Sequence, residues 1–98
     1  MSTPPTLGTE TQAFLRAIAS PTRQSVLLLF SEGVELSVND VAARANLGQS
    51  TASEQLAQLR AGGALAARRE GRATFYRADR EGIAKALAEI QAYVQSCC

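Results

Sequence analysis

Side chains that could hydrogen-bond to the bases of a nucleic acid lie close together in the middle of the sequence. Two glutamines, two serines and a threonine occur between residues 49 and 55: Gln49, Ser50, Thr51, Ser53 and Gln55. Glutamine can pair twice with the edge of an adenine, the threonine methyl group can contact that of thymine, and serine can bond to phosphate or base. The same residues would also make an ordinary polar helix face, so the choice between these two interpretations depends on the neighbouring sequence.

Arginines are concentrated in the region around and after these residues. The stretch 44–80 contains seven arginines and three acids, a net charge of +4, although the whole chain carries only +1. The preceding stretch, 24–43, contains three acids and no base. This asymmetry is typical of a face that binds an anionic partner, and equally of a solvated surface with scattered arginines.

The two cysteines are adjacent, and the sequence contains no histidine. Neighbouring thiolates at Cys97 and Cys98 could hold As(III) or another thiophilic ion, could oxidise within or between chains, or could be an inert exposed pair. Without histidine the commonest catalytic base and the commonest zinc ligand are missing, and there is no glycine-rich phosphate loop. We therefore expect a protein that is not an enzyme and that requires no cofactor.

Length and composition indicate one globular domain. The chain has 98 residues, of which 46% are hydrophobic and 19% charged. Its longest apolar run, Val26–Phe30, is too short to cross a membrane, and residues 1–10 lack the features of a secretion signal. We expect a cytoplasmic protein with no membrane partner. A domain this small buries only about two-thirds of its unfolded surface, which favours self-association.

Apolar spacing and capping residues predict four helices in the first two-thirds of the chain. Their expected bounds are 9–19, 21 to about 33, 38–45 and 49–61. Ser20-Pro21 is a start signal for the second helix, and the Ser37-Val38-Asn39-Asp40 segment resembles a capping box for the third. Asn46 and Gly48 delimit a three-residue turn between the third and fourth helices. This arrangement is a helix-turn-helix.

A β-hairpin and a final helix are predicted after residue 64. Leu65–Arg69 and Ala73–Arg77 flank a glycine-containing tip, and Asp79 caps the last helix. We divide the chain into a flexible tail at 1–8, one domain at 9–96 and a cysteine tail at 97–98. Apolar residues of the first and last helices are expected to form a dimer interface, the alternative being that they belong to the core: Phe14, Leu15, Ile18, Ile83, Leu87, Ile90 and Val94.

A helix-turn-helix followed by a hairpin is a winged helix-turn-helix, and four blocks of this sequence resemble the ArsR/SmtB-type repressors, small dimeric bacterial regulators best known for sensing metals and arsenite. The blocks are SPTRQSVLLLF, ELSVNDVA, GQSTASEQLAQLRAGG and ARREGRATFYR. The resemblance extends from about Ala13 to Val94. It implies a mainly α fold with a β-hairpin wing, a homodimer formed through the first and last helices, and a double-stranded DNA operator with inverted-repeat symmetry.

The resemblance also implies roles for particular residues. The N-terminal half of the fourth helix would enter the major groove, with Gln49, Ser50, Thr51, Ser53 and Gln55 as the residues that read bases. Arg69 and Arg72 at the wing tip would reach the DNA backbone or the minor groove, with Arg68 and Arg60 nearer the phosphates. Glu54 departs from the family pattern, which commonly has an amide there, and it leaves the operator sequence open.

Most sensing sites of the family are missing. Ser37 and Asn39 occupy the positions of its Cys-x-Cys metal ligands, and the second helix has no cysteine to pair with one on the last helix. Only Cys97 and Cys98 are left to respond to a soft metalloid or a thiol-oxidising signal. The alternatives are a repressor of this family with no thiol-based inducer, and a winged-helix module that binds other proteins.

Overall fold

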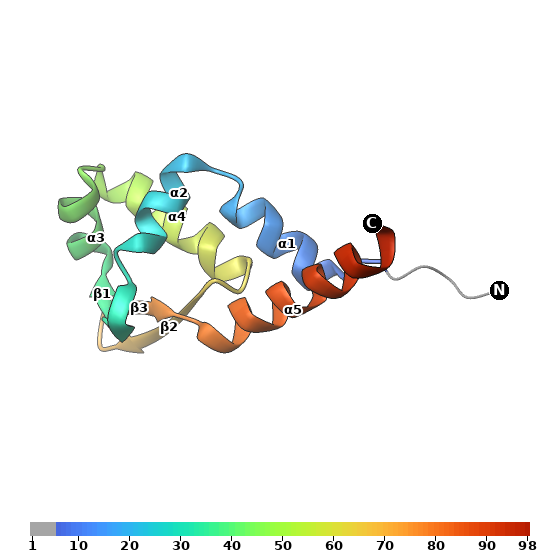
Figure 1. Cartoon of the computed structure of the whole chain (residues 1–98). Coiled ribbons are helices and arrows are strands. Elements are labelled where there is room, and N and C mark those ends of the chain that lie inside the picture. The colour runs from blue at the N-terminus through green and yellow to red at the C-terminus, as the bar shows by residue number, and fades with distance from the viewer. Residues whose placement is uncertain (1–5) are drawn as a thin grey trace.

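The computed structural model describes residues 6–98, so residues 1–5 of the expected tail lie outside the described residues. Five α-helices, a short 3-10 helix and a three-stranded antiparallel sheet form a winged helix-turn-helix, mainly α as expected (Figure 1). The elements are α1 (Thr9–Ile18), α2 (Pro21–Leu28), η1 (Ser31–Gly33), β1 (Leu36–Ser37), α3 (Val38–Ala45), α4 (Gln49–Ala61), β2 (Leu65–Glu70), β3 (Ala73–Ala78) and α5 (Arg80–Cys97).

The core is organised around α4, which packs against α1, α2, α3 and the start of β2. Ala52, Leu56 and Leu59 recur at helical spacing on one side of α4, and all three are completely buried. Burying each leucine side chain contributes about 1.5–3 kcal/mol. The opposite side of α4 is consequently left to solvent, because one face of a helix determines where the other face points.

The predicted capping residues define the helix ends. The Ser20 side chain accepts from the Arg23 amide at 3.3 Å, with Pro21 at the first helical position. Ser37 and Asp40 form the predicted capping box, and the hydrogen bond from the Ser37 amide holds the pKa of Asp40 below its usual value. Asn46 ends α3 in the left-handed conformation, with φ of 55°. These predictions are confirmed.

The hairpin is also confirmed, with each strand one residue longer than expected. β2 and β3 pair from Leu65↔Ala78 to Glu70↔Ala73, and Gly71 at the tip has φ of 61°. The third strand, β1, was not predicted. It pairs with β3 through Leu36↔Tyr76 and Ser37↔Phe75. Two residues are too few to show an alternating pattern in the sequence, so only their partner strand reveals them.

The prediction that the second helix continues to about Gly33 is wrong. α2 ends at Leu28, and the chain turns so that Phe30 enters the core. Glu32 and Gly33 then adopt left-handed conformations, with φ of 63° and 75°. A left-handed residue cannot continue an α-helix, so the run of apolar residues here reflects a buried turn.

α5 lies along α1, and its C-terminal end extends beyond the start of α1 (Figure 1). Asp79 caps it as expected, accepting from the Gly82 amide at 3.0 Å. Gly8, the residue before α1, donates its amide to the Glu89 carboxylate on α5. Within residues 6–98, no helix is long and apolar enough to cross a membrane.

Close packing of α1 on the end of α4 predicts a stability effect at Gly62. A Cβ atom there would collide with Ala17 Cβ and lie 2.9 Å from the Ala13 carbonyl oxygen. We expect Gly62→Ala to lower the free energy of unfolding by about 1–3 kcal/mol, measured by urea denaturation. Gly48→Ala is the matched control, because a Cβ there has no atom within 4 Å, and we expect it to cost less than about 1 kcal/mol. Equal stability of the two variants would contradict this packing.

Candidate nucleic-acid interface

The N-terminal half of α4 presents a polar surface to solvent. Four of the residues predicted to read bases are exposed there: Gln49, Ser50, Thr51 and Ser53. Gly48 precedes them without a capping side chain, so the first amides of α4 are open to an external acceptor. The partial positive charge of a helix N-terminus makes an anion the favoured acceptor.

The hairpin and α4 meet at a shallow cleft of about 220 Å³. Gln49 lines it from α4 and Arg72 from the wing, with Ser37 and Asn39 at the start of α3. Of the residues that the structure describes, 6–98, none that lines the cleft is acidic. The exposed end of α4 and the arginine of the wing tip therefore face the same space.

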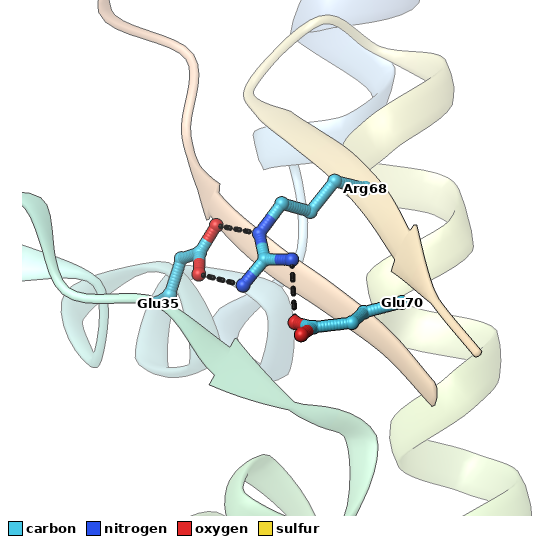
Figure 2. Close-up of polar contacts among 3 residues, drawn as sticks. All are labelled: Glu35, Arg68 and Glu70. Atoms are coloured by element: carbon cyan, nitrogen blue, oxygen red, sulfur yellow. Dashed lines mark hydrogen bonds and ion pairs between the residues drawn. The ribbon is translucent and has the colours of Figure 1, made fainter. Parts of the chain in front are cut away.

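Arg68 lies differently from the other wing arginines. Its guanidinium makes two bonds to the Glu35 carboxylate, at 2.7 and 2.8 Å, and a third to Glu70 at 2.8 Å (Figure 2). The ring of Phe75 lies beneath it, 4.9 Å from the guanidinium carbon to the ring centre. The pKa of Arg68 is raised and that of Glu35 lowered, both chiefly by their mutual hydrogen bonds. With its donors bonded to carboxylates, Arg68 joins β2 to the segment before β1, and we do not assign it the expected phosphate contact.

Arg60 lies at the other end of α4 from Gln49. It follows Gln49 by eleven residues on α4, a distance of about 16 Å along a helix axis. There it lines a hollow of about 280 Å³ together with Glu10, Phe14 and Lys85. Arg69 and Arg72 are exposed beside the tip of the hairpin. The contact of these arginines with DNA stays a prediction.

Gln55 and Glu54 differ in their surroundings. Gln55 is half-buried, and its Oε1 accepts from Arg23 Nη1 at 3.1 Å, a contact with α2 that the sequence did not indicate. Glu54 is exposed. Among residues 6–98 the ion pairs are Arg68 with Glu35 and with Glu70, and Lys85 with Glu10, so Arg44 does not neutralise Glu54.

The residues predicted for a dimer interface differ in exposure and form three groups. Phe14 is 3% exposed and belongs to the core of its own chain, so it is not available to a second copy. Ile18, Ile83 and Ile90 pack partly against that core, and Leu15 is half-buried. Leu87 and Val94 on α5 are 53% and 51% exposed, and Tyr93, which the sequence analysis omitted, lies beside Val94 and is also exposed. Among the residues predicted for the interface, the exposed ones are thus on α5; outside that set, Leu28 on α2 is 77% exposed.

Cys97 and Cys98 lie at the exposed end of α5, joined as a vicinal disulfide. This is one of the arrangements that the sequence allowed. Within the described part of the chain, no three His, Cys, Asp or Glu side chains come together as a metal site would require. The two sulfurs are therefore without a third protein ligand from residues 6–98 of the same chain.

Comparison with known proteins shows the class of protein to which a chain with this interface belongs. A family model described as a helix-turn-helix domain matches residues 18–68. A biofilm growth-associated repressor of Agrobacterium fabrum is 32% identical over 85 residues, which cover 87% of this chain and 72% of the repressor. A helix-turn-helix transcriptional regulator of Mycobacterium tuberculosis is 36% identical over 76 residues, 78% of this chain but 33% of that protein. The chain therefore spans about a third of the length of the second relative.

Solved structures that resemble this chain include transcriptional regulators as well. The homodimeric winged helix-turn-helix DNA-binding domain of a possible ArsR-family regulator from Mycobacterium bovis has a TM-score of 0.69 and 31% identity, covering 90% of this chain and 81% of that domain. A possible transcriptional regulator for arsenical resistance has a TM-score of 0.71 and 32% identity, covering 83% of both chains.

The fold and the exposed face of α4 thus define a winged helix-turn-helix domain of a transcriptional regulator. The chain belongs to the ArsR/SmtB-type family of these regulators. The two sequence relatives are named as regulators and not as enzymes, as the sequence analysis expected.

The different surroundings of Arg68 and Arg72 predict different effects on DNA binding. Arg72→Ala should weaken binding to all sequences alike and reduce the slope of log affinity against log salt by about one phosphate contact. Arg68→Ala should change that slope much less, because carboxylates already neutralise this guanidinium. Fluorescence anisotropy with labelled duplex at several salt concentrations measures both. An equal change of slope in the two variants would instead assign Arg68 to a phosphate.

Proposed function

We propose that the chain is a sequence-specific transcriptional repressor that binds an inverted-repeat operator in double-stranded DNA as a homodimer. The cleft shared by Gln49 of α4 and Arg72 of the wing carries this proposal. It puts a group that can read a base edge next to a fixed positive charge, with no acid between them. We propose a cytoplasmic location as well, because the named relatives are bacterial and a bacterial DNA partner lies in the cytoplasm.

Different residues hold the domain in position on the DNA and discriminate between its bases. Arg69, Arg72 and the first amides of α4 bind phosphates, which fixes how the domain sits on the duplex. Gln49, Ser50, Thr51 and Ser53 face the major groove and discriminate bases by hydrogen bonds and by the threonine methyl group. Burial of the opposite side of α4 keeps Ser50, Thr51 and Ser53 directed outward while α4 enters the groove, and Gln49 is exposed as the first residue of the helix.

The dimer follows from the exposed apolar surface of α5. Leu87, Tyr93 and Val94 would be covered by a second copy, and the related Mycobacterium bovis domain is described as homodimeric. A two-fold axis relates two recognition helices, which then meet the same groove about one turn, or roughly 34 Å, apart. The operator should therefore consist of two inverted half-sites.

Selection from a library of random duplexes tests this function directly. We expect the recovered DNA to contain an inverted repeat, and Gln49→Ala or Thr51→Ala to relax base preference within each half-site by about 1–3 kcal/mol for the affected base pair. Recovery of a single unrepeated half-site bound by monomer would refute the dimeric operator. If the protein binds no duplex in a salt-dependent manner, the alternative of a protein-binding module, which the exposed Glu54 on this face favours, takes precedence.

We further propose that Cys97 and Cys98 make the repressor responsive to a soft metalloid or to thiol oxidation. Two adjacent thiolates suit As(III), with a third sulfur supplied by the partner subunit or by a free thiol. Alternatively, hydrogen peroxide takes two electrons and two protons from the thiols, forming the disulfide and two molecules of water. Because α5 also carries the proposed dimer surface, either change would alter the spacing of the two recognition helices.

Replacing both cysteines with serine separates sensing from binding. The Cys97→Ser/Cys98→Ser protein should bind operator DNA as tightly as the reduced wild type, because both residues are exposed and distant in sequence from α4. Arsenite or a peroxide should release the reduced wild type from DNA and leave the variant bound, as measured by anisotropy titration. Equal release of the two proteins would show that the thiols are not the sensor.

A further inference from the structure

Arg23 of α2 bridges the end of α1 and the recognition helix α4. Its Nε donates to the Ala17 carbonyl at 2.6 Å, its Nη2 to the Arg16 carbonyl at 3.2 Å, and its Nη1 to Gln55 Oε1 at 3.1 Å. One half-buried side chain thus spans three elements. No role in DNA binding follows from its sequence position, since it precedes the recognition helix by 26 residues.

Arginine suits this position for two reasons. The carbonyls at a helix C-terminus carry partial negative charge, so a cation is favoured at the end of α1. The planar guanidinium also directs its N–H groups to several acceptors at once, which the single ammonium of lysine cannot reproduce. No carboxylate competes for it, since none of the ion pairs among residues 6–98 involves Arg23.

The bond from Arg23 decides which end of the Gln55 amide is available. A guanidinium only donates, so the oxygen of Gln55 must be the atom that faces it. The Nε2 group, with two N–H donors, is left for other partners. A glutamine that pairs twice with adenine needs both its oxygen and its nitrogen, and here one of the two lone pairs of the oxygen is engaged and the oxygen is turned to Arg23.

We infer that Arg23 is a positioning residue of the DNA interface, which holds Gln55 so that it acts on DNA only as a hydrogen-bond donor. The acceptor is a base atom, such as purine N7, or a phosphate oxygen. This inference rests on the proposed function, and it changes the expected part of Gln55 from a residue that reads adenine with both ends of its amide to one that only donates.

A set of four variants tests the inference on duplexes selected with the wild-type protein. Arg23→Met removes all three hydrogen bonds, Gln55→Ala removes the amide, and the double variant combines them. Gln24→Ala is the matched control, because Gln24 Nε2 also donates to the end of α1, at the Ile18 carbonyl 2.8 Å away, but no bond joins it to α4. Thermal unfolding of each variant is recorded alongside DNA affinity.

The expected pattern is non-additive. Arg23→Met and Gln55→Ala should each weaken DNA binding roughly 2- to 10-fold, as expected for loss of one hydrogen bond. The double variant should bind no more weakly than Arg23→Met, because both changes remove the same contact. Gln24→Ala should stay within about 2-fold of wild type. A double variant whose loss equals the product of the two single losses would overturn the inference.

Altered DNA identifies the acceptor and separates positioning from a general effect on folding. Duplexes carrying a 7-deazapurine or a methylphosphonate at one position each lack a single base or phosphate acceptor. Wild type should bind one of these modified duplexes more weakly, whereas the affinities of Gln55→Ala and Arg23→Met should be the same with and without that modification. A loss with a 7-deazapurine would assign the acceptor to a base, and a loss with a methylphosphonate would assign it to a phosphate. If no position distinguishes wild type from Gln55→Ala, Gln55 does not donate to DNA and the inference is wrong.

A substitute variant covers a failure to fold, and two outcomes distinguish failure of the inference from failure of the proposed function. If Arg23→Met does not fold, Arg23→Lys takes its place, because lysine keeps a cation at the end of α1 but lacks the planar guanidinium. The affinity of Arg23→Lys for DNA should likewise not change when the acceptor is substituted. If wild type binds no duplex, the proposed function fails. If wild type binds and the Arg23 variants behave like Gln24→Ala, only the role of Arg23 fails.

Discussion

Burial of one face of α4 is the constraint on which the rest of the molecule depends. Ala52, Leu56 and Leu59 are completely removed from solvent, between the first three helices and the start of the hairpin. Because a helix has a fixed period, burying these positions turns Ser50, Thr51 and Ser53 toward solvent without any contact of their own, and Gln49 is exposed as the first residue of the helix. The surface proposed to face DNA is therefore largely a consequence of core packing, and the hydrophobic free energy that stabilises the fold also orients residues proposed to read bases.

The arginines show that charge along a chain does not translate directly into binding charge. Arg68 is bonded to Glu35 and Glu70, and Arg23 is bonded to backbone carbonyls and an amide. Arg69 and Arg72 are exposed at the hairpin tip. Guanidinium groups bonded to carboxylates join elements to one another, whereas those at the hairpin tip can exchange their counterions for phosphate. The positive stretch of the sequence thus serves the attachment of the wing as well as the DNA contact proposed for it.

Local signals in the sequence were sufficient for most of the fold. Ser20-Pro21, the Ser37–Asp40 box, Asn46 and Gly71 act within a few residues of themselves, so each could be recognised without knowledge of the tertiary structure. β1 and the end of α2 could not, because a two-residue strand exists only through β3, and Phe30 leaves the helical path to reach the core. Phe14 was ambiguous for a related reason, since an apolar helix face fits either a core or an interface.

The sequence by itself determined the order of the elements, the ends of most helices and the polar character of the recognition helix, because these depend on periodicity and on interactions between near neighbours. Only the tertiary structure decided which polar groups are still free. Whether Arg68 meets Glu35, or Gln55 meets Arg23, depends on residues more than thirty positions apart being brought within hydrogen-bond distance. Such long-range pairs leave no local pattern, and they separate the side chains that can contact DNA from those that hold the protein together.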